Sequence, residues 1–405
     1  MVLAVMCVGY FLVLLDVTAL NVAVPTIGAG LGVGVTGLQW VVNGYALALA
    51  ALLLVGGALG DANGHRRVVL AGLALFGAAS AGCGLAPTVG VLVVARVLQG
   101  VGAALLLPGT LAIITRTFPE PAAQARAIGV WAGVGSVALP AGPLLGGGLV
   151  ATWGWRSVFL VNVPVVLVAA LGTLRTVRSD RVDGSHLDLD ALVRAVLGLL
   201  RRPAFAVANA VAAAMNFGSL GLLFLLSLFL QTVQQRSASA AGAAVLPLFL
   251  PLVVLAPLAG RATARWGPRP TMLAGLGVAA VGVALLSSWD VTTPYGGLLP
   301  AMLAWGIGLG VLTPAVVAAA LAAALAAAPR QYAGLASGVN SAARQAGGVA
   351  GVALYGSVAG APADPARFLA GLHLTGLVTA GLFLVAGVST AIAVPTRSRL
   401  GAPDR

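Results

Sequence analysis

The sequence predicts an all-α membrane protein with twelve transmembrane helices in two six-helix, pseudo-symmetric halves. Hydrophobic residues make up 60% of its 405 residues, charged residues make up 8%, and the mean hydropathy is +1.04. Soluble domains carry about 25% charged residues, so a conventional soluble enzyme is excluded. Many apolar runs reach the roughly 20 residues that a helix needs to cross about 30 Å of hydrocarbon, which excludes a β-barrel of short alternating strands.

Apolar runs between polar turns place the expected helices. In the first half they are expected at 2–25, 38–59, 68–86, 90–114, 126–151 and 157–174. In the second half they are expected at 204–231, 240–260, 270–289, 296–323, 334–360 and 368–394. The expected organisation is an N-terminal half, a cytoplasmic linker, a C-terminal half and a cytoplasmic tail, at 1–174, 175–203, 204–394 and 395–405. Within the linker, 189–200 has the pattern of a short amphipathic helix on the inner surface.

The basic residues, all of them arginine, indicate the orientation. If the amino terminus is cytoplasmic, seventeen of the 22 lie on the inner side, three lie on the outer side, and Arg96 and Arg344 lie within helices. The positive-inside rule then predicts that both termini are cytoplasmic. The arginines are spaced between apolar runs, so the net charge of +12 does not suggest a nucleic-acid partner. Cys7 and Cys83 are expected to pack as small apolar side chains, without a disulfide.

A weak repeat relates the two halves. The segment GHRRVVLAG at 64–72 stands between the second and third expected helices. The segment GPRPTMLAG at 267–275 stands between the eighth and ninth, at an offset of 203 residues. Parallel repeats of this kind place a substrate site between the halves near the membrane midplane, and rocking of one half against the other gives alternating access.

Asp16 stands inside the apolar stretch LVLLDVTALNVAVP at 12–25. An aspartate at the centre of a membrane helix costs roughly 2.5 to 3.5 kcal/mol, and such residues usually mark an ion or substrate path. The nine other acidic residues fall in loops, at helix ends or in the tail. Asp16 is therefore the only candidate for a buried carboxylate that couples transport to protonation.

Arg96 is the expected partner of Asp16. Counting about 1.5 Å per residue, Asp16 lies ~13 Å and Arg96 ~9 Å below the outer ends of their helices, so their depths permit contact. A nearby guanidinium favours the ionised carboxylate, whereas burial favours the neutral acid, and this competition suits a proton carrier. We hypothesise that Asp16 carries the proton and that Arg96 promotes its release when the pair rearranges. A static ion pair that locks helices one and four is the alternative.

The loop GALGDANGHRRVVL at 57–70 combines turn and charge signals; its motif residues are Gly57, Asp61, Gly64, Arg66 and Arg67. Glycines allow tight turning, the aspartate can cap a helix or form a salt bridge, and the arginines lie on the positive side. With this loop the chain resembles the major facilitator superfamily, in which the loop latches the outward-open state. Ala62 and His65 replace residues that are often basic there, which predicts a weaker latch. A simple turn with a topology signal is the alternative.

Further segments resemble the drug:proton antiporter family of that superfamily, whose members usually have fourteen helices. The segments are LDVTALNVAVP at 15–25, LQWVVNGYALA at 38–48, WRSVFLVNVP at 155–164 and SGVNSAARQAGGVAGVAL at 337–354. Helix four matches the family pattern L-x-x-x-R-x-x-Q-G-x-G-x-A at each named position, including Gln99, Gly100 and Gly102. The hairpin that usually follows helix six is missing, which reduces the expected number of helices to twelve and preserves the orientation.

Helix five carries GVWAGVGSVALPAGPLLGGG at 129–148. This segment resembles the antiporter signature that ends G-P-x-x-G-G, here Gly142, Pro143, Gly146 and Gly147, although Ala138 stands where a glycine is usual. Gly-Pro interrupts the helical hydrogen bonds and the later glycines remove bulk, so the helix can bend and pack closely. The resemblance implies export rather than uptake, and a generic kinked helix is the alternative.

Polar and aromatic residues within the helices define a candidate substrate cavity, which comprises Asn21, Gln39, Trp40, Tyr45, Asn216, Asn340 and Arg344. Arg344 is expected near the cytoplasmic end of helix eleven, where it either snorkels to the surface or gates the path. His373 is interpreted as an interfacial or packed histidine. Trp305 and Phe224 are interpreted as packing residues.

The sequence shows no P-loop, no G-x-S-x-G motif and no paired metal-ligand spacing, so we expect no catalytic residues, no metal and no cofactor. The resemblance implies a proton antiporter that is driven by the proton gradient and exports amphipathic drug-like or antibiotic-like small molecules. We expect a monomer in a bacterial inner membrane whose partners are the substrate, protons and the lipid bilayer. The alternatives are an exporter of one specific metabolite or amino acid and a non-transporting sensor or scaffold with the same fold.

Overall fold

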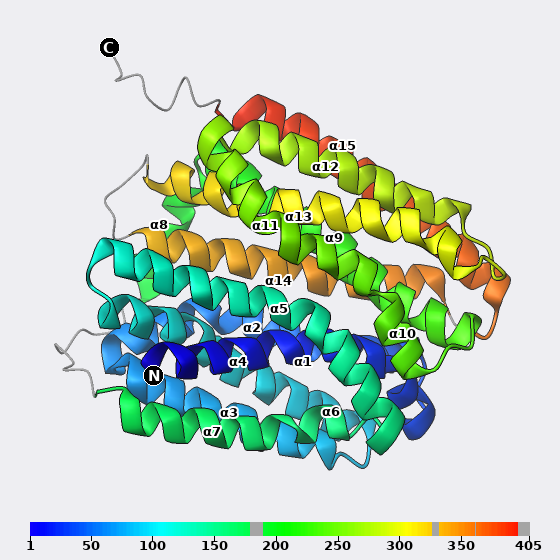
Figure 1. The fold of residues 1–405 in the computed structure, drawn as a ribbon, viewed down its shortest axis with the longest axis horizontal. Coiled ribbons are helices and arrows are strands. Elements are labelled where there is room, and N and C mark those ends of the chain that lie inside the picture. The colour runs from blue at the N-terminus through cyan, green and yellow to red at the C-terminus, as the bar shows by residue number, and fades with distance from the viewer. Residues whose placement is uncertain (179–188, 326–331, 361, 396–405) are drawn as a thin grey trace. The chain divides into compact units, whose positions relative to one another are not determined.

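The computed structural model describes residues 1–178, 189–325, 332–360 and 362–395. Figure 1 shows that this part of the chain is built from helices. Residues 179–188 of the expected linker and 396–405 of the expected tail lie outside the described residues. The helix expected at 189–200 is present as α8 (Leu189–Leu200), with Val193 and Leu197 exposed.

The helices before α8 are α1 (Val2–Leu31), α2 (Val35–Asn63), α3 (His65–Gly84), α4 (Val89–Thr117), α5 (Pro121–Trp153), α6 (Ser157–Leu160) and α7 (Asn162–Thr176). Those after it are α9 (Pro203–Leu228), the π-helix η1 (Phe229–Val233), α10 (Ala238–Ala244), α11 (Leu246–Trp266), α12 (Pro268–Ala284), the 3₁₀-helix η2 (Leu285–Ser288), α13 (Tyr295–Leu325), α14 (Tyr332–Ala359) and α15 (Pro365–Ala393). Eleven helical segments in the described ranges are long and apolar enough to cross a membrane. With α14, of 28 residues, they give the twelve helices that the sequence predicts.

Two expected helices are interrupted near prolines. The span expected at 157–174 divides at Val161 into α6 and α7, and the span expected at 240–260 divides at Val245 into α10 and α11. Pro164 and Pro247 follow these breaks. Because proline has no N–H to donate, the carbonyl four residues before it loses its helical partner and the helix bends or divides.

α1 behaves differently, since it continues through Pro25 to Leu31 and the predicted end at residue 25 is wrong. Pro25 leaves the carbonyl of Asn21 without its helical donor, and the Ser227 hydroxyl donates to that carbonyl. The Gln231 amide donates to the carbonyl of Val22 at 2.9 Å. Membrane helices accommodate a proline where a neighbouring helix satisfies the freed group in this way.

The chain forms two compact units. The first comprises Met1–Leu187 and Leu226–Ala244, and the second comprises Asp188–Leu225 and Val245–Arg405. α10 joins the first unit through glycine contacts with α5: a Cβ atom at Gly242 would lie 2.1 Å from the Pro143 carbonyl oxygen. The boundaries of the halves that the sequence suggests remain a prediction.

The sequence repeat has a structural counterpart inside each unit. Gly64 directly precedes α3 and Gly267 directly precedes α12, both with φ of +90°, a conformation that favours glycine. A Cβ atom at Gly72 would lie 2.9 Å from the carbonyl oxygen of Gly102 on α4. The repeat-related Gly275 stands equally close to the carbonyl oxygen of Gly308 on α13. The same glycine spacing therefore makes the same helix contact in both halves.

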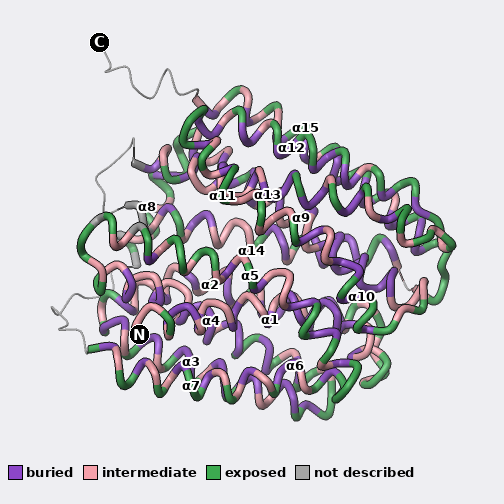
Figure 2. Tube along the Cα trace, in the orientation of Figure 1, coloured by how far each residue is buried: buried purple, intermediate pink, exposed green. Residues whose placement is uncertain are grey.

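α4 has a central position in the first unit because glycines let its neighbours approach. A Cβ atom at Gly100 would lie 2.3 Å from the Tyr45 carbonyl oxygen on α2, and one at Gly102 would lie 2.8 Å from the Phe76 nitrogen on α3. Figure 2 shows that α4 and its neighbours combine buried and exposed faces. Cys7 and Cys83 are both buried and free, as the sequence predicts.

Candidate functional site

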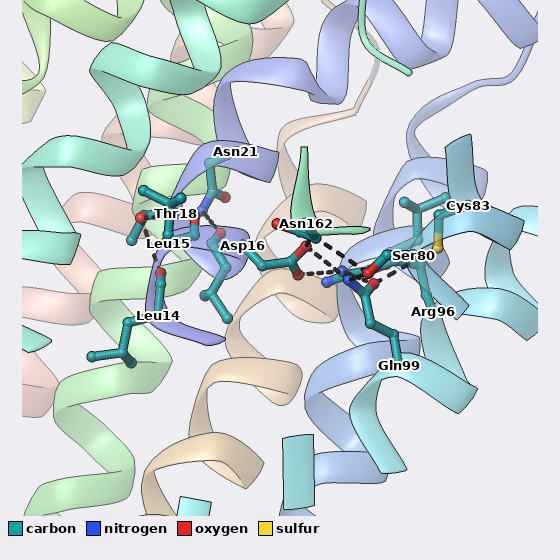
Figure 3. Close-up of polar contacts among 12 residues, drawn as sticks. Leu14, Leu15, Asp16, Thr18, Asn21, Ser80, Cys83, Arg96, Gln99 and Asn162 are labelled. Atoms are coloured by element: carbon teal, nitrogen blue, oxygen red, sulfur yellow. Dashed lines mark hydrogen bonds and ion pairs between the residues drawn. The ribbon is translucent and has the colours of Figure 1, made fainter. Parts of the chain in front are cut away.

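Asp16 and Arg96 form an ion pair inside the first unit. Asp16 on α1 and Arg96 on α4 are each 1% exposed, and Arg96 Nη1 donates to Asp16 Oδ2 at 2.6 Å. Figure 3 shows the carboxylate of Asp16 pointing towards the side chains of α4. A buried charge is tolerated when it is paired and its remaining hydrogen-bonding capacity is satisfied, so the neighbours of this pair matter.

Two amides complete the contacts to the carboxylate. Gln99 Nε2 donates to Asp16 Oδ1 at 2.9 Å, and Asn162 Nδ2 donates to the same oxygen at 2.8 Å. Gln99 Nε2 also donates to the Ser80 hydroxyl at 2.9 Å. We call Asp16, Ser80, Arg96, Gln99 and Asn162 the polar cluster; all five side chains are buried. Arginine and the two amides all contact the carboxylate through N–H donors, and these donors occupy both of its oxygens.

The guanidinium of Arg96 has partners besides Asp16. Its Nε donates to the Val41 carbonyl at 3.2 Å, and its Nη1 donates to Gln99 Oε1 at 2.7 Å. The Tyr45 ring centroid lies 4.3 Å from its Cζ and the Phe159 centroid lies 5.8 Å away. These contacts stabilise a cation, so the guanidinium has hydrogen bonds and aromatic contacts in addition to its ion pair.

Helix geometry explains how residues that are distant in sequence meet at one point. Arg96 and Gln99 are three residues apart on α4, and Ser80 and Cys83 have the same spacing on α3, which places each pair on one helix face. Asn162 is the first residue of α7, directly after the break at Val161. Four helices thus each direct one or two polar groups to the cluster.

The glycines of the helix-five motif bring α5 against the part of α1 that follows Asp16. A Cβ atom at Gly142 would lie 1.9 Å from the Thr18 hydroxyl oxygen, and one at Gly146 would lie 2.8 Å from the Ala19 carbonyl oxygen. Gly147 faces α10 instead, because its Cβ atom would lie 2.7 Å from the Ala238 carbonyl oxygen. Each of these three positions therefore removes bulk from a helix contact.

The loop motif forms a separate group of contacts. Asp61 Oδ1 lies 3.2 Å from His65 Nε2 and 3.7 Å from Arg116 Nη2. Arg66 donates to the Leu174 carbonyl at 2.8 Å, and Arg67 is exposed. The motif thus connects α2, α3, α4 and α7. A Cβ atom at Gly57 would meet only the Pro108 ring, at ordinary contact distance.

The expected cavity residues of the first unit have different environments. Tyr45 packs on Arg96 of the polar cluster. Asn21 is buried and donates to the Val17 carbonyl at 3.0 Å, and Gln39 is buried. Trp40 is 55% exposed. Tyr45 is thus the residue through which the predicted cavity meets the ion pair, by its ring contact with the guanidinium.

In the second unit, the candidate cavity residues lie on α9 and α14. Asn340 donates to Asn209 Oδ1 at 3.3 Å, and Arg344 donates to the Ser341 hydroxyl at 3.4 Å. Asn216 is half-buried. Trp305 and Phe224 are fully buried in the packing, and His373 Nε2 lies 2.8 Å from the Trp289 carbonyl oxygen, as a packed histidine does.

Asn162 and Ser80 belong to the polar cluster, although the sequence patterns assign no role to either residue. Asn162 lies within the segment 155–164, and an amide in an apolar helix is a signal of the same kind as Asp16. The hydroxyl of Ser80 is too common in membrane helices to stand out. In the described residues, no group of three or more His, Cys, Asp or Glu side chains is placed to hold a metal ion.

The family of this chain is identified by its similarity to known sequences. Residues 6–352 match the model of the Major Facilitator Superfamily. The multidrug resistance protein Stp of Mycobacterium tuberculosis is 34% identical over 407 residues, which cover 86% of this chain and 74% of that protein. The tetracenomycin C resistance and export protein of Streptomyces glaucescens is 33% identical, over 87% of this chain and 74% of that protein. The methylenomycin A resistance protein of Bacillus subtilis is 31% identical, over 88% of this chain and 87% of that protein.

Solved structures agree on the fold. A bacterial homologue of the human lysosomal transporter Spinster, in an inward-facing and unoccupied conformation, gives a TM-score of 0.80 at 20% identity, over 100% of this chain and 98% of that one. The xylose transporter XylE from E. coli, in an inward-open conformation, gives a TM-score of 0.70 at 13% identity. The match covers 97% of this chain and 96% of that one. Together with the helix count and the repeated glycine contacts, these similarities confirm the predicted twelve-helix fold in two halves.

Proposed function

The chain belongs to the Major Facilitator Superfamily, and from this premise we propose that it is a proton-coupled antiporter that exports amphipathic drug-like or antibiotic-like small molecules by alternating access. The names of its relatives support this substrate class: they are a multidrug resistance protein, a tetracenomycin C resistance and export protein and a methylenomycin A resistance protein. All three align with more than 85% of this chain.

The observation that carries the proton coupling is the environment of Asp16. Among the described residues, it is the one acidic side chain that is buried. Removal from water favours the neutral acid, and contact with Arg96 and two amides favours the ionised carboxylate. Because Arg96 also contacts the Val41 carbonyl, Gln99 and the Tyr45 ring, protonation of Asp16 leaves the arginine with other partners. Asp16 is therefore the side chain to which we assign the transported proton.

The link to substrate movement is the contact between α1 and α5. Gly142 and Gly146 hold α5 against Thr18 and Ala19, two and three residues beyond Asp16. A movement of α1 against α5 displaces the carboxylate from the donors on α4 and α7. The protonation of Asp16 and the state of this helix contact are coupled in this proposal, as alternating access with a single coupling site requires.

One buried carboxylate supports one proton per transport cycle. Exchange of one proton for a neutral compound is then electrogenic, and exchange for a monovalent cation is electroneutral. We place the protein in a bacterial inner membrane as a monomer, with both termini cytoplasmic because the positive-inside rule favours that orientation. The proton gradient supplies the energy in this proposal, without a cofactor.

Asp16→Asn is the first test of the proposal. In proteoliposomes, we expect the wild type to release protons when substrate is added and Asp16→Asn to lose this proton flux. In an efflux-deficient host, the wild type should raise the tolerated concentration of several unrelated lipophilic drugs, whereas Asp16→Asn should not. Asp290→Asn, which changes an exposed loop carboxylate, is the matched control and should behave as the wild type.

The outcomes distinguish the proposal from its competitors. Unchanged proton coupling in folded Asp16→Asn would exclude the carrier role. Activity confined to one compound would indicate an exporter of a specific metabolite, and the absence of any proton-coupled flux would indicate a sensor or scaffold. Obligatory symport in inside-out vesicles would contradict export.

A further inference from the structure

Asn162 has a hydrogen-bonding capacity that the ionised cluster does not use. Its Nδ2 donates to Asp16 Oδ1 at 2.8 Å and lies 3.5 Å from the Ser80 hydroxyl oxygen. Its Oδ1 is buried and has no hydrogen-bond partner among the described residues. A buried amide oxygen without a donor costs free energy, so its presence next to a functional carboxylate requires an explanation.

The neutral form of Asp16 needs an acceptor, whereas the three residues that contact its carboxylate all do so through N–H donors. Protonation adds an O–H group to the side chain, whereas Arg96 offers only N–H groups. Gln99 Oε1 is already occupied, because it accepts from Arg96 Nη1 at 2.7 Å and lies 3.7 Å from Cys83 Sγ. Of the two amide oxygens in the cluster, the one without a donor belongs to Asn162.

We propose that Asn162 is a positioning residue for the protonation of Asp16: its amide donates to the carboxylate, and when Asp16 takes up a proton the amide turns so that Oδ1 accepts the acid O–H. This inference rests on the proposed function of Asp16 as the proton carrier. The only covalent bond formed is the O–H bond of the acid; the bond that breaks is an O–H bond of a hydronium ion from the aqueous phase, which becomes water.

The local structure permits this rotation. The final torsion of an asparagine side chain has a broad, roughly two-fold preference, so the amide exchanges its nitrogen and oxygen without leaving a deep rotamer well. The Ser80 hydroxyl both donates and accepts, so it can bond either end of the amide. Gln99 is less free to turn, because each of its amide atoms contacts two residues of its surroundings.

Asp16 is the acidic member of the polar cluster, and its charged and polar neighbours come from several helices. Arg96 from α4, Tyr45 from α2 and Cys83 from α3 interact with its charge. Among the described residues, α5 and α7 direct no charged group towards it. Arginine stays protonated in proteins, so it does not compete for the proton.

Infrared difference spectroscopy of the full chain in lipid nanodiscs tests the inference. Spectra recorded at low minus high pH should contain a C=O stretching band of protonated Asp16, and Asp16→Asn should abolish it. In Asn162→Ala, the band should persist and shift to higher frequency, because each hydrogen bond to a protonated carboxyl lowers its stretching frequency. Asn63→Ala, which removes an exposed asparagine outside the polar cluster, should leave the frequency unchanged.

The outcomes separate this inference from the proposed function. If Asp16→Asn leaves every acid band in place, the carrier role of Asp16 fails. If Asp16→Asn removes the band but Asn162→Ala leaves its frequency unchanged, the carrier role stands and the role of Asn162 is refuted. A purely structural Asn162 would lower the thermal stability of the variant without moving the band.

A second measurement needs no substitution at Asn162 and covers the case in which Asn162→Ala does not fold. With ¹³C-labelled asparagine, the difference spectrum of the wild type should contain an isotope-sensitive side-chain carbonyl band whose frequency changes between the two pH values. The same band should be absent from labelled Asp16→Asn. A wild-type spectrum without any isotope-sensitive asparagine change would overturn the inference.

Discussion

At Asp16, the unfavourable burial of a charge is offset by an unusual density of donors. Arg96, Gln99 and Asn162 all donate to its carboxylate, and the distances lie between 2.6 and 2.9 Å. Charge-assisted hydrogen bonds of this length are about twice as strong as neutral ones. The same contacts make the stability of the protein sensitive to substitution at this site, because removing one partner of the ion pair leaves the other charge buried and unpaired.

Arg96→Met should therefore lower the free energy of unfolding by about 3 to 5 kcal/mol, the usual cost of breaking a buried ion pair from one side. The measurement is equilibrium unfolding in mixed detergent micelles. Adding Asp16→Asn to Arg96→Met should recover part of the loss, because the carboxylate is no longer left without its cation. If Arg96→Met lowers the free energy of unfolding by the same amount in the wild type and in Asp16→Asn, the two charges are not energetically coupled.

Arg116→Met is the matched control for this experiment. Arg116 pairs with Asp61 at 3.7 Å, but both side chains are more than half exposed. Exposed ion pairs contribute about 0 to 1 kcal/mol, so this variant should stay within about 1 kcal/mol of the wild type. The contrast tests whether burial, rather than the loss of an arginine, sets the cost.

At the scale of helices, close contacts between α1, α5 and α10 depend on missing side chains. Gly142 and Gly146 face α1, and Gly147 faces α10. Gly148, the next residue of α5, stands in open space, because a Cβ atom there would have no neighbour within 4 Å beyond the adjoining backbone. Gly146 and Gly147 are thus required by helix contacts, whereas Gly148 in the same helix turn is not. Substitutions at contacting and non-contacting glycines of α5 can therefore be compared directly.

Gly142→Ala should destabilise the protein by about 1 to 3 kcal/mol, because overpacking forces the backbones apart, and it should reduce drug efflux. Gly148→Ala should be neutral or stabilise by up to about 1 kcal/mol, because alanine favours the helix. Thermal unfolding in detergent and drug susceptibility in an efflux-deficient host measure the two effects. Equal behaviour of the two variants would contradict the role of close packing.

At the scale of the whole molecule, the two halves reuse one helix contact. Gly72 and Gly275 are 203 residues apart and each approaches a glycine carbonyl on the next long helix. Parallel repeats of six helices are the basis of rocking-type transport, and both halves must keep the same orientation to the membrane. The predicted orientation itself follows from the arginines, through the positive-inside rule.

Cysteine labelling checks the orientation. In a background with Cys7 and Cys83 replaced by serine, we expect Leu85→Cys, between α3 and α4, to react with a membrane-impermeant maleimide on intact cells. Asn63→Cys, between α2 and α3, should react only after permeabilisation. Both positions are exposed, so access to the reagent rather than burial sets the result. The reverse pattern would overturn the predicted orientation.

The sequence alone was sufficient for the class of protein, the number of helices and the internal repeat, because membrane helices follow from local apolar length. It also singled out Asp16, since a carboxylate in an apolar run is unusual wherever the helix lies. It matched the helix-five glycines to a motif without identifying the atoms that face them. Helix ends at prolines were less predictable: α1 continues past Pro25, and the carbonyl that this proline frees accepts a hydrogen bond from Ser227, which is distant in the sequence.

Only the tertiary structure decided which side chains share the site with Asp16. Gln99, Asn162 and Ser80 are 83, 146 and 64 positions away in the sequence, and no local pattern specifies that their helices meet at one depth. The contacts arise because glycines in α4 and α5 allow the backbones to approach and because the chain breaks at Val161 before Asn162. The sequence thus determined which charge is buried, and long-range packing determined which groups stabilise it.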